Sequence, residues 1–198
     1  LPASGGTWSG LHFSSPDTST LSYVRVSGAS ASGVANYGYT WEPFGTAGMQ
    51  SHYPVYANLL ISHSVISHNT GHNGAGLAAY GRHITLEHCT FRANRAQYDG
   101  GAVAVASATL RNCIIADNIA GARGAALVVY GGDISMQNCV VTRNSSSSGE
   151  TLFFTHRGSL NLTNCVVWSN PVQHVFGGTG QFAAVYSDVQ GGYQGMGN

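Results

Sequence analysis

Five of the nine histidines lie close together in the sequence, and histidine side chains can bind metal ions. They are His63, His68, His72, His83 and His88. Metal sites in proteins need a characteristic ligand spacing, which these residues lack. His63 and His88 also occupy the same place in a repeated motif, and later copies of the motif carry asparagine there. This substitution favours hydrogen-bonding corner residues, with a surface metal site in this region as the alternative.

The four cysteines recur at nearly equal intervals along the chain. They are Cys89, Cys113, Cys139 and Cys165. Stacked repeats bring Cα atoms to about 4.8 Å, so an exported protein could form two disulfides here. Side chains stacked in register point in parallel, however, which suits the disulfide torsion poorly and favours a column of free, buried thiols. One zinc ion bound by all four is excluded, because the column would span about 14 Å.

Eight acidic residues could supply the carboxylates that polysaccharide hydrolases and lyases use. They are Asp17, Glu42, Glu87, Asp99, Asp117, Asp133, Glu150 and Asp188. No two of them occupy the same place in adjacent repeats. Glu87 instead falls beside Arg111 and Asp117 beside Arg143, which predicts cross-strand ion pairs on a solvated face. We therefore assign no catalytic residue and favour a non-enzymatic protein, with loop carboxylates as the enzymatic alternative.

These candidate residues belong to a nine-residue motif with cysteine fourth and asparagine last. The copies are LEHCTFRAN (86–94), LRNCIIADN (110–118), MQNCVVTRN (136–144) and LTNCVVWSN (162–170). ISHSVISHN at 61–69 keeps the register with Ser64 in the cysteine place. Small-residue turns followed by short apolar runs, such as GGAVAVA from Gly100, separate the copies. The pattern predicts short strands and turns, and no window shows a helical apolar stripe.

A repeat of about 25 residues made of strands and turns cannot bury its own apolar face, so successive copies must stack. Equivalent residues then form columns, and the final asparagines form a ladder in which each amide donates to the next. The ladder residues are Asn69, Asn94, Asn118, Asn144 and Asn170. The sequence therefore predicts an all-β, single-stranded parallel β-helix, or β-solenoid, of about seven coils with about 25 residues each, forming one domain over residues 1–198.

Two tetrapeptides, FRAN at 91–94 and GGAV at 100–103, are similar to the FxxN and GGA[ILV] signatures of polymorphic outer-membrane protein repeats. The ending YSDVQGGYQGMGN (186–198) resembles the closing segment of secreted bacterial β-helix proteins that carry C-terminal anchors. The chain as a whole resembles right-handed parallel β-helix proteins of the secreted bacterial kind. This resemblance implies a right-handed solenoid outside the cell or on its surface.

An aromatic-rich insertion at 30–58 interrupts the period, because the motif places at Val24 and Ser64 lie much farther apart than those of later copies. Its aromatic residues are Tyr37, Tyr39, Trp41, Phe44, Tyr53 and Tyr56. The rings could pack against the flank of the solenoid. Alternatively, they could form a stacking platform for sugars or a contact patch for another subunit.

Composition narrows the choice of partner. Eight arginines and no lysine balance eight acids, so nothing in the charge favours nucleic acid or an anionic membrane. No apolar run is long enough for a membrane-spanning helix. The expected partners are polysaccharide or further copies of the chain, and no cofactor or metal is expected.

These observations predict an extracellular structural or adhesive solenoid. Its glycine-rich ends carry no charged residue to protect exposed strand edges, so copies could pair end to end into filaments. The alternatives are a polysaccharide lyase or hydrolase, and a glycan-binding module without catalysis.

Overall fold

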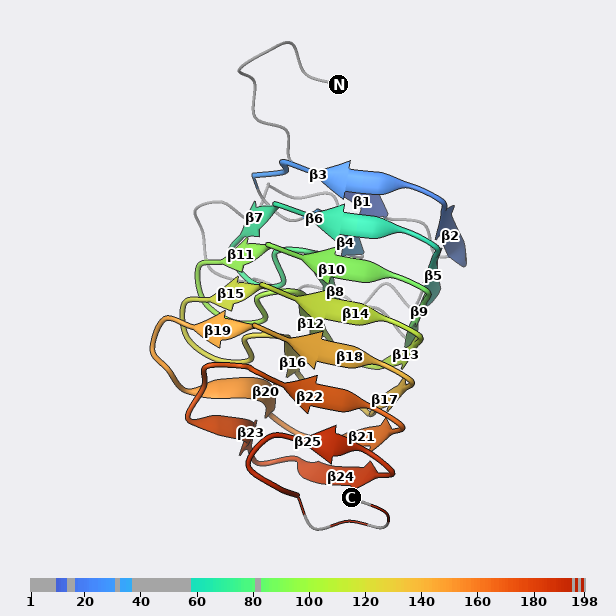
Figure 1. The fold of residues 1–198 in the computed structure, drawn as a ribbon. Helices are drawn as coiled ribbons and strands as arrows, with labels where there is room; N and C mark the ends of the chain where they lie inside the picture. Colours follow the sequence, from blue (N-terminus) through green and yellow to red (C-terminus); the bar gives the residue numbers. More distant parts are fainter. Residues whose placement is uncertain are drawn as a thin grey trace.

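The structure is a computed structural model that describes residues 10–13, 17–30, 33–36, 58–80, 83–193, 195 and 197. These residues form a parallel β-solenoid whose coils stack along one axis from the N-terminal to the C-terminal end (Figure 1). No helix occurs within the described ranges. Each sheet takes its strands from successive coils. The all-β parallel solenoid predicted from the repeat is therefore confirmed.

Four parallel sheets run along the solenoid, and we number them in the order in which the chain visits them. Sheet 1 contains β1 (Leu11–Phe13), β4 (Val34–Asn36), β8 (Leu77–Ala79), β12 (Val103–Val105), β16 (Leu127–Val129), β20 (Thr151–Thr155) and β23 (His174–Gly178). Sheet 2 contains β2 (Ser19–Ser22), β5 (Asn58–Ser62), β9 (His83–Glu87), β13 (Ala108–Arg111), β17 (Ile134–Gln137), β21 (Ser159–Thr163) and β24 (Gln181–Val185).

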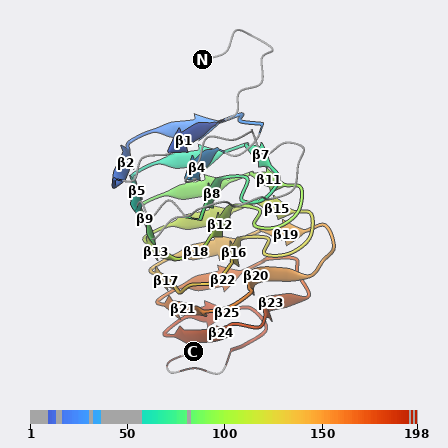
Figure 2. The same cartoon turned by 180° about the vertical axis from the view of Figure 1, so that it is seen from behind.

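Sheet 3 contains β3 (Arg25–Ser27), β6 (Val65–Ser67), β10 (Thr90–Arg92), β14 (Ile114–Ala116), β18 (Val140–Thr142), β22 (Val166–Trp168) and β25 (Asp188–Val189). Sheet 4 contains β7 (Thr70–Gly71), β11 (Arg95–Ala96), β15 (Ile119–Ala120) and β19 (Ser145–Ser146). Sheet 3 faces the reader in Figure 1, and sheet 1 faces the reader in the reverse view of Figure 2.

The number of coils is lower than the seven predicted from the sequence. Five turns of similar length join equivalent places of sheet 3 between Ile66 and Val189. The step before them, from Val26 to Ile66, is much longer and passes through the insertion. The prediction counted copies of the motif, including two weaker copies at 21–29 and 184–192. Seven copies enclose only six steps, and the first step is irregular. The solenoid thus has about five regular turns.

Two corners in each coil depend on residues in the left-handed backbone conformation. The residue before the cysteine place has φ of +48° at His63, +52° at His88 and +53° at Asn112. Asparagine and histidine are enriched in this conformation, which explains why asparagine can replace histidine in this place in the later coils. The residue before the ladder asparagine behaves in the same way, with φ of +58° at Asp117 and +53° at Arg143.

The interior is filled by columns of apolar side chains from successive coils. In sheet 3, Phe91 pairs with Ile66 on one side and Ile115 on the other, and all three are fully buried. A neighbouring column of sheet 2 consists of Leu86, Leu110, Met136 and Leu162. Burial of each large side chain stabilises the fold by roughly 1.5–3 kcal/mol. The stack of coils therefore shares one continuous core.

The four cysteines are free and buried, and they extend the column that begins at Ser64. The Cys113 Sγ donates hydrogen bonds to the carbonyls of Leu86 (3.5 Å) and Arg111 (3.3 Å). The neighbouring thiols and burial raise the pKa of Cys113, and the Cys139 thiol and burial raise that of Cys165. Cys113 and Cys165 therefore stay protonated, and all four buried side chains pack as small, nearly apolar groups.

The buried asparagine ladder is confirmed. The Asn94 Nδ2 and backbone N–H both donate to the Asn118 Oδ1, at 2.9 and 3.0 Å. Asn118 makes the same two bonds to the Asn144 Oδ1, at 2.9 and 3.0 Å. Its Nδ2 also lies 2.9 Å from the Ala116 carbonyl and 3.0 Å from the Phe91 carbonyl. Every coil is thereby joined to the next through polar groups inside the corner.

Two side chains near the C-terminal end of the solenoid contact the last coil. The Gln190 Oε1 accepts a hydrogen bond from the Asn170 backbone N–H at 2.7 Å, which ends the ladder. The Tyr193 ring packs edge-on against Phe176, and its hydroxyl donates to the Phe182 carbonyl at 2.5 Å. Gln190 and Tyr193 therefore pack onto the last coil, and end-to-end pairing of copies stays a prediction.

Candidate functional site

The insertion predicted at 30–58 includes β4, which is a regular strand of sheet 1. Its six candidate contact residues lie outside the described residues: Tyr37, Tyr39, Trp41, Phe44, Tyr53 and Tyr56. A ligand or partner contact at these rings stays a prediction.

The clustered histidines do not gather at one point. His63 stacks on His88, with ring centroids 4.8 Å apart, at an exposed corner. The His83 nitrogens lie 3.1 and 3.0 Å from the hydroxyls of Ser107 and Thr109 in sheet 2 and the turn before it. Among the described residues, no group of three or more His, Cys, Asp or Glu side chains is placed to hold a metal ion.

Three arginines pair with an acid one coil earlier. The two pairs predicted from the sequence are Glu87–Arg111 (3.1 Å) and Asp117–Arg143 (2.7 Å). A third, Asp99–Arg123 (2.8 Å), was not predicted, because both residues lie in the loops between sheet 4 and sheet 1. The Asp99 side chain is only 8% exposed, whereas that of Asp117 is 40% exposed. These carboxylates hold coils together rather than facing one another as an acid–base pair.

Arg123→Met should lower the free energy of unfolding by about 2 kcal/mol, because it leaves the carboxylate of Asp99 buried without its partner. Methionine keeps an apolar stem where Arg123 lies over the Phe154 ring, so the loss reports mainly on the charge. Denaturant unfolding measures the difference. Arg143→Met removes the equivalent arginine from an exposed pair and is the matched control, expected to change stability little. Equal effects in the two variants would contradict this account.

A strip of exposed apolar side chains crosses the outer face of sheet 3. Ile114, Val140 and Val166 are aligned on three successive coils and are 45%, 38% and 43% exposed. Trp168, at the end of β22, is 51% exposed. We call these four residues the outer strip. Aligned exposed apolar residues on a rigid sheet are typical of a surface that contacts another molecule.

The position of the outer strip follows from the alternation of side chains along each strand. In β14 and β18 the middle residue is buried in the core, and the residue before it faces outward and is exposed. The aliphatic residues of the outer strip are those one place after each cysteine, and Trp168 lies three places after Cys165. An apolar residue directly follows each cysteine in CIIAD, CVVTR and CVVWS, so the outer strip could have been predicted from the motif.

Polar groups border the outer strip on both sides. Exposed asparagines Asn112, Asn138 and Asn164 lie at the corner before the strands. At the other corner, hydrogen bonds from Arg143 hold the pKa of Asp117 below its ordinary value. Since the charges of this pair offset each other, the border on this side carries little net charge.

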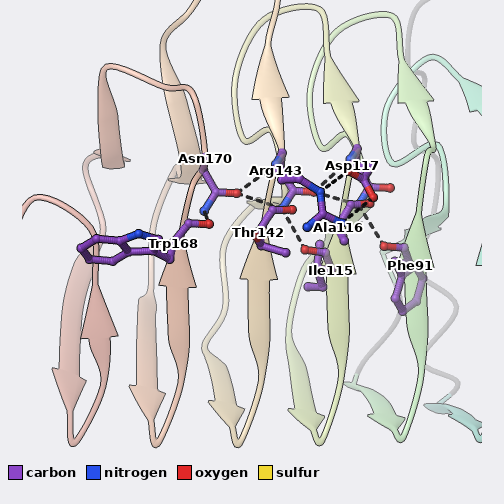
Figure 3. A network of polar contacts seen from close by, with 10 residues as sticks. Phe91, Ile115, Ala116, Asp117, Thr142, Arg143, Trp168 and Asn170 are labelled. Carbon is purple, nitrogen blue, oxygen red and sulfur yellow. Dashed lines mark hydrogen bonds and ion pairs between the residues drawn. The ribbon is translucent and has the colours of Figure 1, made fainter.

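A hollow of about 440 Å³ lies at the corner that follows Trp168 and is lined by Arg143, Ser169, Asn170 and Pro171. Figure 3 shows the Trp168 ring projecting away from the polar contacts of Asn170 and from the Arg143–Asp117 pair. The ladder bonds of Asn170 include one from its Nδ2 to the Trp168 carbonyl at 3.2 Å. The backbone that carries the exposed indole is therefore fixed by the buried ladder.

A family model described as the right handed beta helix region matches residues 5–189. The chain belongs to the right-handed β-helix family. This match confirms the predicted hand of the solenoid, while the similarity to polymorphic outer-membrane protein repeats stays a prediction. Neither a curated protein nor a solved structure matches this β-helix. Within the described residues, no helix has the length and apolar character needed to cross a membrane.

Proposed function

We propose that this β-helix is an extracellular adhesive module that binds a neutral polysaccharide through the outer strip. The observation that carries the proposal is the exposed alignment of Ile114, Val140 and Val166 beside Trp168. Sugar rings have apolar faces and hydroxyl edges. An indole and branched aliphatic side chains suit the faces, and the asparagine amides and Ser169 suit the edges.

Charge favours an uncharged polymer over an anionic one. The chain has a formal net charge of zero, and the charged pair nearest to Trp168 is internally balanced. A nucleic acid or an anionic membrane would require an excess of arginine on the contact face. The extracellular location rests on the resemblance of the repeats to those of secreted bacterial proteins.

The rigidity of the solenoid also favours adhesion. Each strand of the outer strip is bonded to both neighbouring strands of sheet 3, and the ladder holds the adjacent corner. The contact side chains are therefore ordered before binding, which reduces the conformational entropy lost on association. A flat, prearranged face of this kind suits a polymer that also presents a flat surface.

Trp168→Ala should weaken binding to insoluble neutral polysaccharides such as cellulose or chitin by at least about tenfold, because an exposed aromatic anchor is lost. Co-sedimentation of the purified protein with each polymer measures the affinity. Val140→Thr with Val166→Thr keeps the shape and strand propensity of these positions but adds hydroxyls, and should also weaken binding.

Tyr23→Asn is the matched control. It removes another exposed ring from a corner where asparagine is well tolerated, and should leave polysaccharide binding unchanged. Retention of full binding by both the Trp168 variant and the double valine variant would contradict the proposal. Polymer shortening during incubation with the wild-type protein would instead indicate an enzyme.

A further inference from the structure

A groove of about 380 Å³ lies over sheet 4, apart from the outer strip on sheet 3. Arg95, His72 and Gln97 line it, together with the hydroxyl residues Thr70 and Ser147. Among the described residues, no acid lines the groove. Its volume falls in the range of small-ligand sites and exceeds the space that a bare inorganic ion needs.

Arg95 differs from Arg111, Arg123 and Arg143 because it has no acid in the equivalent place of the preceding coil. Arg111, Arg123 and Arg143 each bond an acid one coil earlier. Arg95 instead has Thr70 in that place and Ile119 in the next coil. No carboxylate in the described part of the chain pairs with its guanidinium. A solvent-exposed guanidinium at the groove is thus available to a ligand.

His72 is held in place by two neighbours. Its Nδ1 lies 3.2 Å from the Gln97 Oε1, and its ring packs at 4.4 Å against Tyr98. With this oxygen as acceptor, the Nδ1 carries the hydrogen. The Nε2 makes no hydrogen bond to any residue that the structure describes. The imidazole is therefore oriented, with its Nε2 left to accept a hydrogen bond from a ligand hydroxyl or, in the protonated ring, to donate one to an oxyanion.

Small residues keep the groove open between these polar groups. Gly71, Ala96 and Gly121 lie along it. A Cβ on Gly121 would lie 1.8 Å from the Gln97 carbonyl oxygen, so glycine is required there by the close approach of adjacent coils. The groove is thus a consequence of tight stacking, with Arg95 at the position where the next coil has Ile119.

We infer that this groove binds the oxyanion group of a small ligand, a phosphate, sulfate or carboxylate. A guanidinium forms paired hydrogen bonds with two oxygens of such a group. The amide of Gln97 and the hydroxyls of Thr70 and Ser147 supply further polar contacts, and none of these lining groups repels an anion. The remaining volume accommodates the body of the ligand.

Isothermal titration calorimetry with glucose 6-phosphate, inorganic phosphate and glucose tests this inference. Glucose 6-phosphate should bind with a dissociation constant in the millimolar range or below, and added salt should weaken it. Glucose should bind at least about fivefold more weakly. Tighter binding of inorganic phosphate than of glucose 6-phosphate would identify the free anion as the ligand and would still support the oxyanion site.

Arg95→Gln should reduce the affinity for glucose 6-phosphate at least about fivefold, and His72→Gln should also reduce it. Arg157→Gln removes an exposed arginine that does not line the groove, so it should leave binding unchanged. Equal binding of glucose and glucose 6-phosphate, or unchanged binding in the Arg95 variant, would overturn the inference. Because none of these changes touches the outer strip, polysaccharide binding should persist in every variant.

Discussion

Asn118→Ala is expected to lower the free energy of unfolding by about 3–5 kcal/mol, because each orphaned buried polar group costs about 1–3 kcal/mol. The change removes the acceptor for the Asn94 N–H and Nδ2, and the donor to the carbonyls of Phe91 and Ala116. It also breaks the side-chain bond to the Asn144 Oδ1. All three ladder residues are fully buried. Chemical denaturation with circular dichroism measures the loss.

Two further variants isolate the role of the ladder in this loss. Asn161→Ala removes an exposed asparagine whose side chain bonds the Ser159 hydroxyl, and should change stability by less than about 0.5 kcal/mol. Asn118→Asp keeps the acceptor but loses the donors, so it should also be strongly destabilising. A small effect of Asn118→Ala, similar to that of Asn161→Ala, would show that the ladder contributes little to stability.

Gly121→Ala is expected to destabilise the protein by about 2–4 kcal/mol and to distort the contact between two coils. A Cβ at this position would lie 1.8 Å from the Gln97 carbonyl oxygen and 2.7 Å from its carbon. Both atoms belong to the backbone of the preceding coil, so no flexible side chain can move aside. The Gly121 N–H also bonds the Ala96 carbonyl at 3.1 Å, and this bond would lengthen.

Gly131→Ala is the matched control, because an added Cβ there has no atom within 4 Å. It should leave the denaturation midpoint nearly unchanged, or raise it slightly by restricting the unfolded chain. Hydrogen exchange should show faster opening around β11 and β15 in the Gly121 variant alone. Similar midpoints for the two variants would mean that the coils can separate locally without cost.

Much of the fold could be predicted because each coil repeats the same pattern of inward-facing apolar residues and polar corner residues. Leu110 and Ile115 recur in equivalent form in every copy, so the inward columns were visible from spacing alone. The ladder was visible for the same reason, since a buried asparagine at a fixed place needs a partner of its own kind. The predicted number of coils was too high because the motif does not show how its first and last copies join the stack.

The candidate surfaces were less visible in the sequence. The outer strip combines residues that look ordinary singly, such as Val140 and Val166, and becomes a patch only when stacking aligns them. The aromatic content of the insertion suggested a contact site, but composition alone does not predict where side chains lie. The Asp99–Arg123 pair was missed because both residues lie in the loops between sheet 4 and sheet 1, outside the nine-residue motif.

The sequence by itself determined the parallel solenoid, its period and its buried columns, because these follow from a repeat that cannot bury its apolar face alone. Only the tertiary structure decided what the remaining polar and exposed residues do. It placed His63 and His88 at left-handed corners and paired three of the arginines. It also put Thr70 and Ile119, rather than an acid, beside Arg95 in the neighbouring coils. Such outcomes depend on which side chain lies one coil away, and that neighbour is distant along the chain.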